Sequence, residues 1–279
     1  MIQGFRDSGQ YVTLFHRKAL PTSAERNGHN GHGSWKEGLH MKALIMAAGK
    51  GTRISRYIEG KPKCTVDIGG MRLIEYTIQK LLAWNVDKIG VVLGYQAGVL
   101  EDILSEYPVE IYYNYFYEVT NSIASAWFAK DFIDDDMVMM NADVFVEESV
   151  INRLFTMEKE TMLLSDSSRK EMADYKFYYE DNQLIKFGKE LEGEDISGEY
   201  VGIARVGRSF LPEFKERLQN LIEEGKYNMW WEDVLYSFVG ERPIYVEDVA
   251  GQFWAEVDFI EDYERILEFR GVKGAAMDG

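Results

Sequence analysis

From residue 41 onward, the sequence alternates between short apolar stretches with strand character and longer stretches with helical spacing. Strands are predicted at 43–47, 88–93, 110–113 and 137–140, and helices at 73–84, 99–105, 122–131 and 147–157. Such alternation is typical of an α/β fold, in which helices cover both faces of a parallel sheet. Ligands of these sheets bind beyond the carboxyl ends of the strands.

The second half of the chain is richer in strands. They are predicted at 162–165, 175–179, 183–187, 200–206, 244–246 and 253–256, with a tight turn at Asp181-Asn182. Helices are predicted at 210–223, 231–238 and 260–269. Neither a repeat nor a linker follows Met41, so residues 41–279 are predicted to form one domain with a mixed, mainly parallel sheet.

Residues 1–40 lack a sustained period and contain Asn-Gly-His-Asn-Gly-His-Gly-Ser. This composition indicates a flexible extension, either native or added for expression. An ordered arm with a short strand at 11–15 is the alternative.

The strand at 43–47 runs directly into a glycine turn with several cations. Residues 47–53 read Ala-Ala-Gly-Lys-Gly-Thr-Arg, and Lys61-Pro62-Lys63 follows. Because Gly49 and Gly51 lack a Cβ, backbone N–H groups there can approach a phosphate chain closely. The cations would neutralise its charge. The glycines alone fit any tight strand-to-helix turn equally well. The Walker A pattern is absent and the dinucleotide fingerprint lacks its third glycine.

Composition excludes several classes of function. The formal net charge of −16 argues against nucleic acid or an anionic membrane as a partner. The single cysteine, Cys64, excludes an intramolecular disulfide, fits a reducing cytoplasm and is interpreted as a small buried residue beside the turn. No apolar run approaches 18 residues, so no membrane span is expected.

All four histidines precede Met41. This excludes Ser-His-Asp and Cys-His catalysis, and histidine-ligated zinc, from the predicted domain. A metal site there must use mainly oxygen ligands, which favours Mg²⁺ or Mn²⁺.

Two aspartates follow predicted strands. Asp143 comes after the strand at 137–140, and Asp258 lies in Trp-Ala-Glu-Val-Asp-Phe before the last helix. An aspartate at a strand end can hold Mg²⁺ on a nucleotide. Each could equally be a turn residue or a helix N-cap.

Two further segments are unusual in composition. Residues 227–233 read Tyr-Asn-Met-Trp-Trp-Glu-Asp, which fits either core packing at a helix start or an aromatic and acidic pocket for a cationic group. Residues 114–122 read Asn-Tyr-Phe-Tyr-Glu-Val-Thr-Asn-Ser, which fits either a loop with an N-cap or a ligand-contacting loop.

The ordered set of motifs, with Gly-Glu-Tyr-Val-Gly-Ile at 198–203, resembles the nucleotidyltransferases that make sugar nucleotides and CDP-alcohols. Within them it is most similar to bacterial CTP:phosphocholine and 2-aminoethylphosphonate cytidylyltransferases. The resemblance covers roughly residues 41–270. It implies a Rossmann-like, GT-A-like nucleotidyltransferase fold.

The resemblance also implies roles for individual residues. Arg53 and Lys63 would contact phosphates and serve catalysis, and Asp143 and Asp258 would hold the metal, with Glu256 as a further candidate. The nucleotide would be bound by Ala47, Ala48, Gly49, Gly51, Thr52, Arg53, Thr120, Asn121 and Ser122. The acceptor would be bound by Trp230, Trp231, Glu232, Asp233 and Trp254.

The implied activity is nucleotidyl transfer from CTP, with Mg²⁺ or Mn²⁺, to a small amine-bearing phosphate or phosphonate such as phosphocholine or 2-aminoethylphosphonate. A sugar-1-phosphate nucleotidyltransferase and a non-catalytic nucleotide-binding protein are the alternatives. The sequence leaves open the acceptor, the choice of CTP over another nucleotide, and the oligomeric state, a homodimer included.

Overall fold

The computed structural model describes residues 40–272 except 52, 55–57, 85, 157 and 158. The extension predicted at 1–40 therefore lies outside the described residues, apart from His40.

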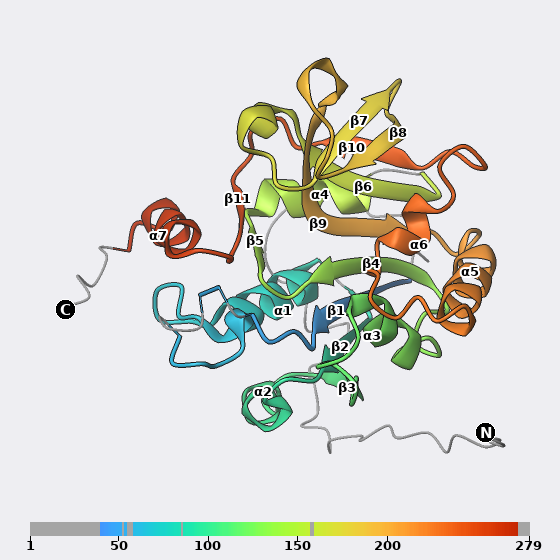
Figure 1. The fold of residues 1–279 in the computed structure, drawn as a ribbon. Coiled ribbons are helices and arrows are strands. Elements are labelled where there is room, and N and C mark those ends of the chain that lie inside the picture. The colour runs from blue at the N-terminus through green and yellow to red at the C-terminus, as the bar shows by residue number, and fades with distance from the viewer. Residues whose placement is uncertain (1–39, 52, 55–57, 85, 157–158, 273–279) are drawn as a thin grey trace, which may run out of the picture.

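A nine-stranded sheet in the order β3-β2-β1-β4-β9-β6-β10-β8-β7 forms the centre of the molecule (Figure 1). Its first four strands in space are mutually parallel. They are β1 (Met41–Ala47), β2 (Lys88–Leu93), β3 (Val109–Tyr113) and β4 (Asp136–Asn141). The long strand β9 (Gly198–Val206) runs antiparallel to β4 and so joins this parallel half to the rest of the sheet.

The other half of the sheet is mostly antiparallel. It contains β6 (Thr161–Asp166), β7 (Lys176–Glu180), β8 (Gln183–Gly188) and β10 (Tyr245–Asp248), of which only β6 and β10 pair in parallel. The mixed α/β fold is thus as predicted, with its parallel character confined to two regions. The turn between β7 and β8 is also as predicted, because Asp181 and Asn182 both have positive φ, 49° and 59°.

Seven α-helices are described, and six of them cover the two faces of the sheet as predicted (Figure 1). Alternate residues of β1 point to opposite faces. Ala43 and Ile45 pack with α1, α2 and α4 on one face, whereas Leu44 and Met46 pack with α3, α5 and α6 on the other. The bounds are α1 (Leu73–Ala83), α2 (Ala97–Leu104), α3 (Ser122–Phe128), α4 (Glu148–Thr156), α5 (Leu211–Glu223) and α6 (Asp233–Tyr236). None of the helices among the described residues is long and apolar enough to cross a bilayer.

A separate two-stranded sheet lies beside the end of β4. It pairs β5 (Val144–Val146) antiparallel with β11 (Trp254–Glu256), and α7 (Ile260–Phe269) packs against it. The strand β5 was not predicted, because three residues are too few to show a period. Phe145 is buried there, with its ring 4.8 Å from that of Tyr76 and 5.8 Å from that of Phe253.

Replacing Phe145 with alanine should lower the free energy of unfolding by about 3–5 kcal/mol, because it leaves a cavity between β5, α1 and α7. Urea denaturation would measure the loss. Phe116, which is 58% exposed, provides the matched control, and Phe116→Ala should cost less than about 1 kcal/mol. Equal losses in the two variants would contradict this account of the packing.

Candidate active site

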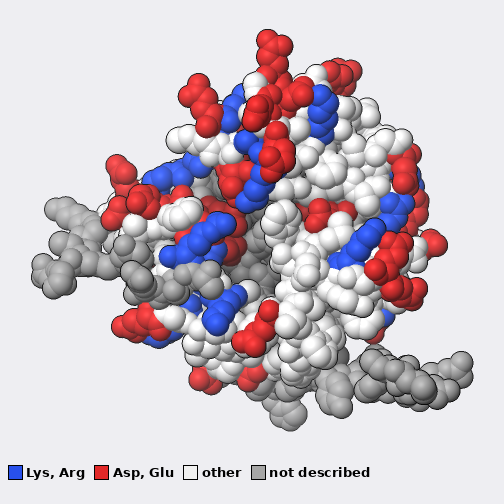
Figure 2. All heavy atoms as spheres, viewed as in Figure 1, with Lys and Arg blue, Asp and Glu red and all other residues white. Residues whose placement is uncertain are grey.

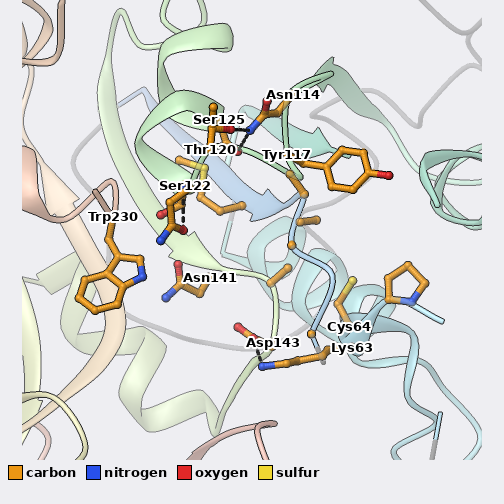
Figure 3. A pocket seen from close by; sticks show the side chains of 18 of the residues that line it. Lys63, Cys64, Asn114, Tyr117, Thr120, Ser122, Ser125, Asn141, Asp143 and Trp230 are labelled. Carbon is orange, nitrogen blue, oxygen red and sulfur yellow. Dashed lines mark hydrogen bonds and ion pairs between the residues drawn. The ribbon is translucent and has the colours of Figure 1, made fainter. Parts of the chain in front are cut away.

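A cavity of about 290 Å³ opens at the carboxyl ends of β1 and β4 (Figure 3). Its wall contains most of the residues predicted to bind the nucleotide: Ala47, Ala48, Gly49, Gly51, Thr120, Asn121 and Ser122. Thr52 lies outside the described residues. The cavity is also lined by Met46, Pro62, Lys63, Cys64, Asn114, Tyr117, Ser125, Asn141, Ala142, Asp143, Trp230 and Glu256. The glycine turn and the loop at 114–122 therefore face the same space.

Three carboxylates converge at one end of this cavity. Asp143, Glu256 and Asp258 each offer an oxygen, and these oxygens all lie within 4.8 Å of one another. The β5–β11 pairing brings them together, since Glu256 is paired with Val144 and the Val257 N–H donates to the Asp143 carbonyl at 2.9 Å. A set of carboxylate oxygens at this spacing suits a hard divalent cation. The two aspartates predicted from sequence thus meet, with Glu256 between them in the chain.

Lys63 lies against these acids. Its ammonium contacts Asp258 and lies 3.1 Å from Asp143. Burial acts to lower the pKa of Lys63, but the two carboxylates outweigh it and raise that pKa above its ordinary value. Lys63 therefore stays positively charged. Arg53, half exposed, donates to the other oxygen of Asp258 at 2.5 Å and does not line the cavity itself.

The position of Lys63 depends on Gly51. Gly51 has a φ of +59°, and a Cβ added there would lie 2.3 Å from Cγ of Lys63. The lysine side chain thus crosses directly over the glycine. A Cβ at Gly49 would meet nothing within 4 Å, so this position is open toward the cavity.

Polar side chains order the loop at 114–122. Asn114, 1% exposed, donates from Nδ2 to the hydroxyls of Thr120 and Ser125, both at 3.1 Å. Asn121 caps α3, accepting from the Ser122 N–H, and also lines the cavity. It therefore fits both interpretations of this segment. Asn114 and Ser125 also line the cavity, but they were not predicted as site residues. The position of Asn114 directly after a strand could have indicated such a role.

The aromatic and acidic segment divides between the cavity wall and the core. Trp230 lines the cavity and is 40% exposed. Trp231 and Glu232 are buried behind the wall and contact Asn141, while Asp233 accepts from the Trp230 N–H at 2.8 Å. Of these four residues, only Trp230 lines the cavity. The prediction that Trp231, Glu232 and Asp233 also face an acceptor there is corrected, because neighbouring residues at this helix start point in different directions.

Trp254 also differs from its predicted place. It is 4% exposed, donates to Asp166 at 2.8 Å and lies under the Arg169 guanidinium, away from the cavity. Trp254 is therefore a buried aromatic residue on strand β11, and it does not line the cavity.

Burial changes the ionisation of three side chains near the cavity. It raises the pKa of Glu232 from about 4.5 to about 8, although the hydrogen bond from Asn141 acts in the opposite direction. Burial and the charges of Asp143 and Asp258 raise the pKa of Glu256 well above its ordinary value. Cys64 is buried beside the turn, as interpreted from the sequence, and this burial raises the pKa of its thiol to about 12.

The surface in Figure 2 mixes acidic and basic side chains. Among the described residues on this face, no continuous basic surface of the kind that binds nucleic acid is visible.

Comparison with known proteins identifies the class to which this fold and cavity belong. The MobA-like NTP transferase domain matches residues 43–218, and the chain belongs to that family. A CTP:phosphocholine cytidylyltransferase structure from Streptococcus pneumoniae shares the fold, with a TM-score of 0.69 and 19% identity over 83% of this chain and all of that one.

Two of the curated relatives that are similar to this chain are named as cytidylyltransferases. A CTP:phosphoglutamine cytidylyltransferase from Campylobacter jejuni is 27% identical over 82% of this chain and 100% of its own. A choline-phosphate cytidylyltransferase from Streptococcus pneumoniae is 26% identical over 82% of this chain and 97% of its own.

Replacing Gly51 with alanine should lower kcat/KM by at least about tenfold, since the new Cβ would displace Lys63 and the positive φ adds strain of about 1 kcal/mol or more. The rate of nucleotidyl transfer would be measured from the release of pyrophosphate. Gly98 in α2 is the matched control: it has open space around its Cβ position, and Gly98→Ala should keep wild-type turnover. A fully active Gly51→Ala enzyme would show that the close packing of Lys63 over Gly51 is not needed for activity.

The raised pKa of Glu232 predicts a pH effect on stability. The folded protein keeps the Glu232 proton up to about pH 8, whereas the unfolded chain loses it near its ordinary pKa of about 4.5. Stability contributed by this group is therefore lost as pH rises from 5 to 8. Relative to Glu232→Gln, the wild type should lose up to a few kcal/mol across that range.

The measurement is the free energy of unfolding by urea at several pH values. The exposed Glu216 on α5 is the control, and Glu216→Gln should follow the wild type. Parallel pH curves for wild type and Glu232→Gln would show that Glu232 does not titrate in this way.

Proposed function

We propose that this protein is a cytidylyltransferase that uses CTP and Mg²⁺ to activate a small amine-bearing phosphate or phosphonate. An acceptor oxygen would attack the α-phosphorus of CTP, forming a new P–O bond. The bond to the β-phosphate would break and pyrophosphate would leave. The product is a CDP- or CMP-linked compound.

One observation carries the proposal: three clustered carboxylates and an ammonium lie beside a glycine turn, and Asp143, Glu256 and Lys63 of this group line the same cavity as Trp230. The backbone at Gly49 and Gly51 can approach phosphates, and Lys63 keeps its positive charge. Because the phosphate or phosphonate oxygen is already ionised, no general base is needed, and positioning with charge neutralisation suffices. The absence of histidine after His40 agrees with this chemistry.

Asp143, Glu256 and Asp258 would hold the metal, since all three offer oxygen ligands within 4.8 Å of one another. A bound Mg²⁺ or Mn²⁺ would neutralise charge on the triphosphate. Lys63 is the only described cation that contacts both predicted metal ligands, and it would move toward phosphate when the acids take up a cation.

CTP is supported by the activities named for the two curated relatives. The amine is supported by Trp230, whose ring lies at 5.5 Å from that of Tyr175 in an edge-to-face pair. Lys189 lies 5.9 Å from the Trp230 ring centroid, so this ring is already placed where it can receive a cation.

The test is a pyrophosphate-release screen of four NTPs against phosphocholine, 2-aminoethylphosphonate, an amino-acid-derived phosphate and sugar 1-phosphates. CTP with an amine-bearing acceptor should be the best pair, and EDTA should abolish its turnover. Asp143→Asn should reduce kcat by at least about 100-fold, because it removes one anionic ligand from the cation.

Asp102 in α2 is exposed and outside the cavity, so Asp102→Asn is the matched control and should retain full activity. Preference for a sugar 1-phosphate would favour the alternative nucleotidyltransferase. A protein that binds CTP without turnover of any acceptor would instead be a non-catalytic nucleotide-binding protein.

A further inference from the structure

The side-chain amide of Asn141, the last residue of β4, is held in one orientation by the core behind it. The indole nitrogen of Trp231 lies 2.9 Å from Oδ1 of Asn141. An indole N–H can only donate a hydrogen bond, so the atom that it meets must be the amide oxygen. The amide NH₂ therefore points the other way and cannot exchange places with the oxygen without losing this bond.

Glu232 holds the amide from its other end. Nδ2 of Asn141 lies 3.2 Å from Oε1 of Glu232, which is 4% exposed. The Tyr200 hydroxyl adjoins this carboxyl without reaching hydrogen-bond geometry. A Cβ added at Gly202 would lie 3.5 Å from Nδ2, so the glycine leaves the NH₂ group room. Trp231, Glu232 and Gly202 thus surround the amide on its buried side.

One hydrogen of the NH₂ group has no acceptor in this arrangement. The group carries two hydrogens, and within the described part of the chain it donates only to Glu232. Asn141 also lines the cavity. The structure therefore presents a fixed N–H donor at the cavity wall.

The place of this donor indicates what it meets. In Figure 3, Asn141 lies between Asp143, at the acid cluster, and Trp230. If the attacking oxygen of the acceptor lies near the acid cluster and its amine lies at Trp230, its phosphate or phosphonate group lies beside Asn141. That group has oxygens to spare beyond the one that attacks, and an oxyanion is a strong partner for a fixed N–H.

We propose that Asn141 binds a non-attacking oxygen of the acceptor's phosphate or phosphonate, and that Trp231 and Glu232 are positioning residues for its amide. This inference rests on the proposed function and adds a residue that recognises the anionic end of the acceptor. It also gives the two buried residues of the Trp-Trp-Glu-Asp segment a role behind the wall.

The test is steady-state kinetics with CTP and either phosphocholine or 2-aminoethylphosphonate, whichever the wild type turns over. Asn141→Ser shortens the side chain and removes the amide NH₂ without adding charge. Asn141→Asp replaces the NH₂ with a carboxylate oxygen. Both should raise the acceptor KM by about tenfold or more, while the KM for CTP changes less than about threefold.

Trp231→Phe tests the positioning role. It removes the indole N–H and frees the amide to turn, so the acceptor KM should rise by a smaller factor, about three- to fivefold, with kcat little changed. Trp127 is the matched control: its indole donates to the amide oxygen of Gln219 at 2.8 Å, outside the cavity. Trp127→Phe should leave both KM values unchanged.

Each outcome is decisive. If CTP KM rises in place of acceptor KM, Asn141 contacts the nucleotide and the inference is wrong. An effect of Asn141→Asp without one of Asn141→Ser would reflect a charge near Asp143 and would also overturn it. A wild type that turns over no acceptor would refute the proposed function itself, whereas an active wild type with unaffected Asn141 variants would refute only this inference.

Discussion

The antiparallel pairing of β5 with β11 is the contact on which the candidate site depends. It is short, three residues on each strand, yet it joins the segment after β4 to a segment late in the chain. The cluster around Phe145, Ala255 and Ile266 supplies the apolar burial that so short a ladder needs. The acids converge because this small sheet forms, and the large sheet alone would bring only Asp143 to the cavity.

Charge balance is the second constraint on the site. Carboxylates so close to one another repel, and in a partly buried place that repulsion is only weakly screened. Lys63 and Arg53 offset it, and Gly51 gives Lys63 the path it takes. The glycine turn therefore combines two features in one short segment: open space at Gly49, and room for the Lys63 side chain at Gly51.

Much of the fold could be predicted from the sequence, since strand and helix periods are properties of each segment. Strand direction is a property of the whole chain, so the antiparallel course of β9 could not be predicted from apolar alternation. The roles of Lys63 and Asp143 were inferred from the order of motifs. Asn141 was missed because a single asparagine after a predicted strand resembles any turn residue. Trp230 faces the cavity and Trp231 faces the core because of the direction in which helix α6 begins, and that direction cannot be predicted from the sequence.

The division of the acids between distant segments has a consequence for the newly made protein. A ribosome releases the glycine turn, Lys63 and Asp143 long before residues 254–269 emerge, and a domain generally folds as a unit. Until then, the glycine turn would lie beside only one of the three carboxylates, and β11 would not be there to pair with β5. The cluster of three carboxylates would therefore be completed only late in synthesis.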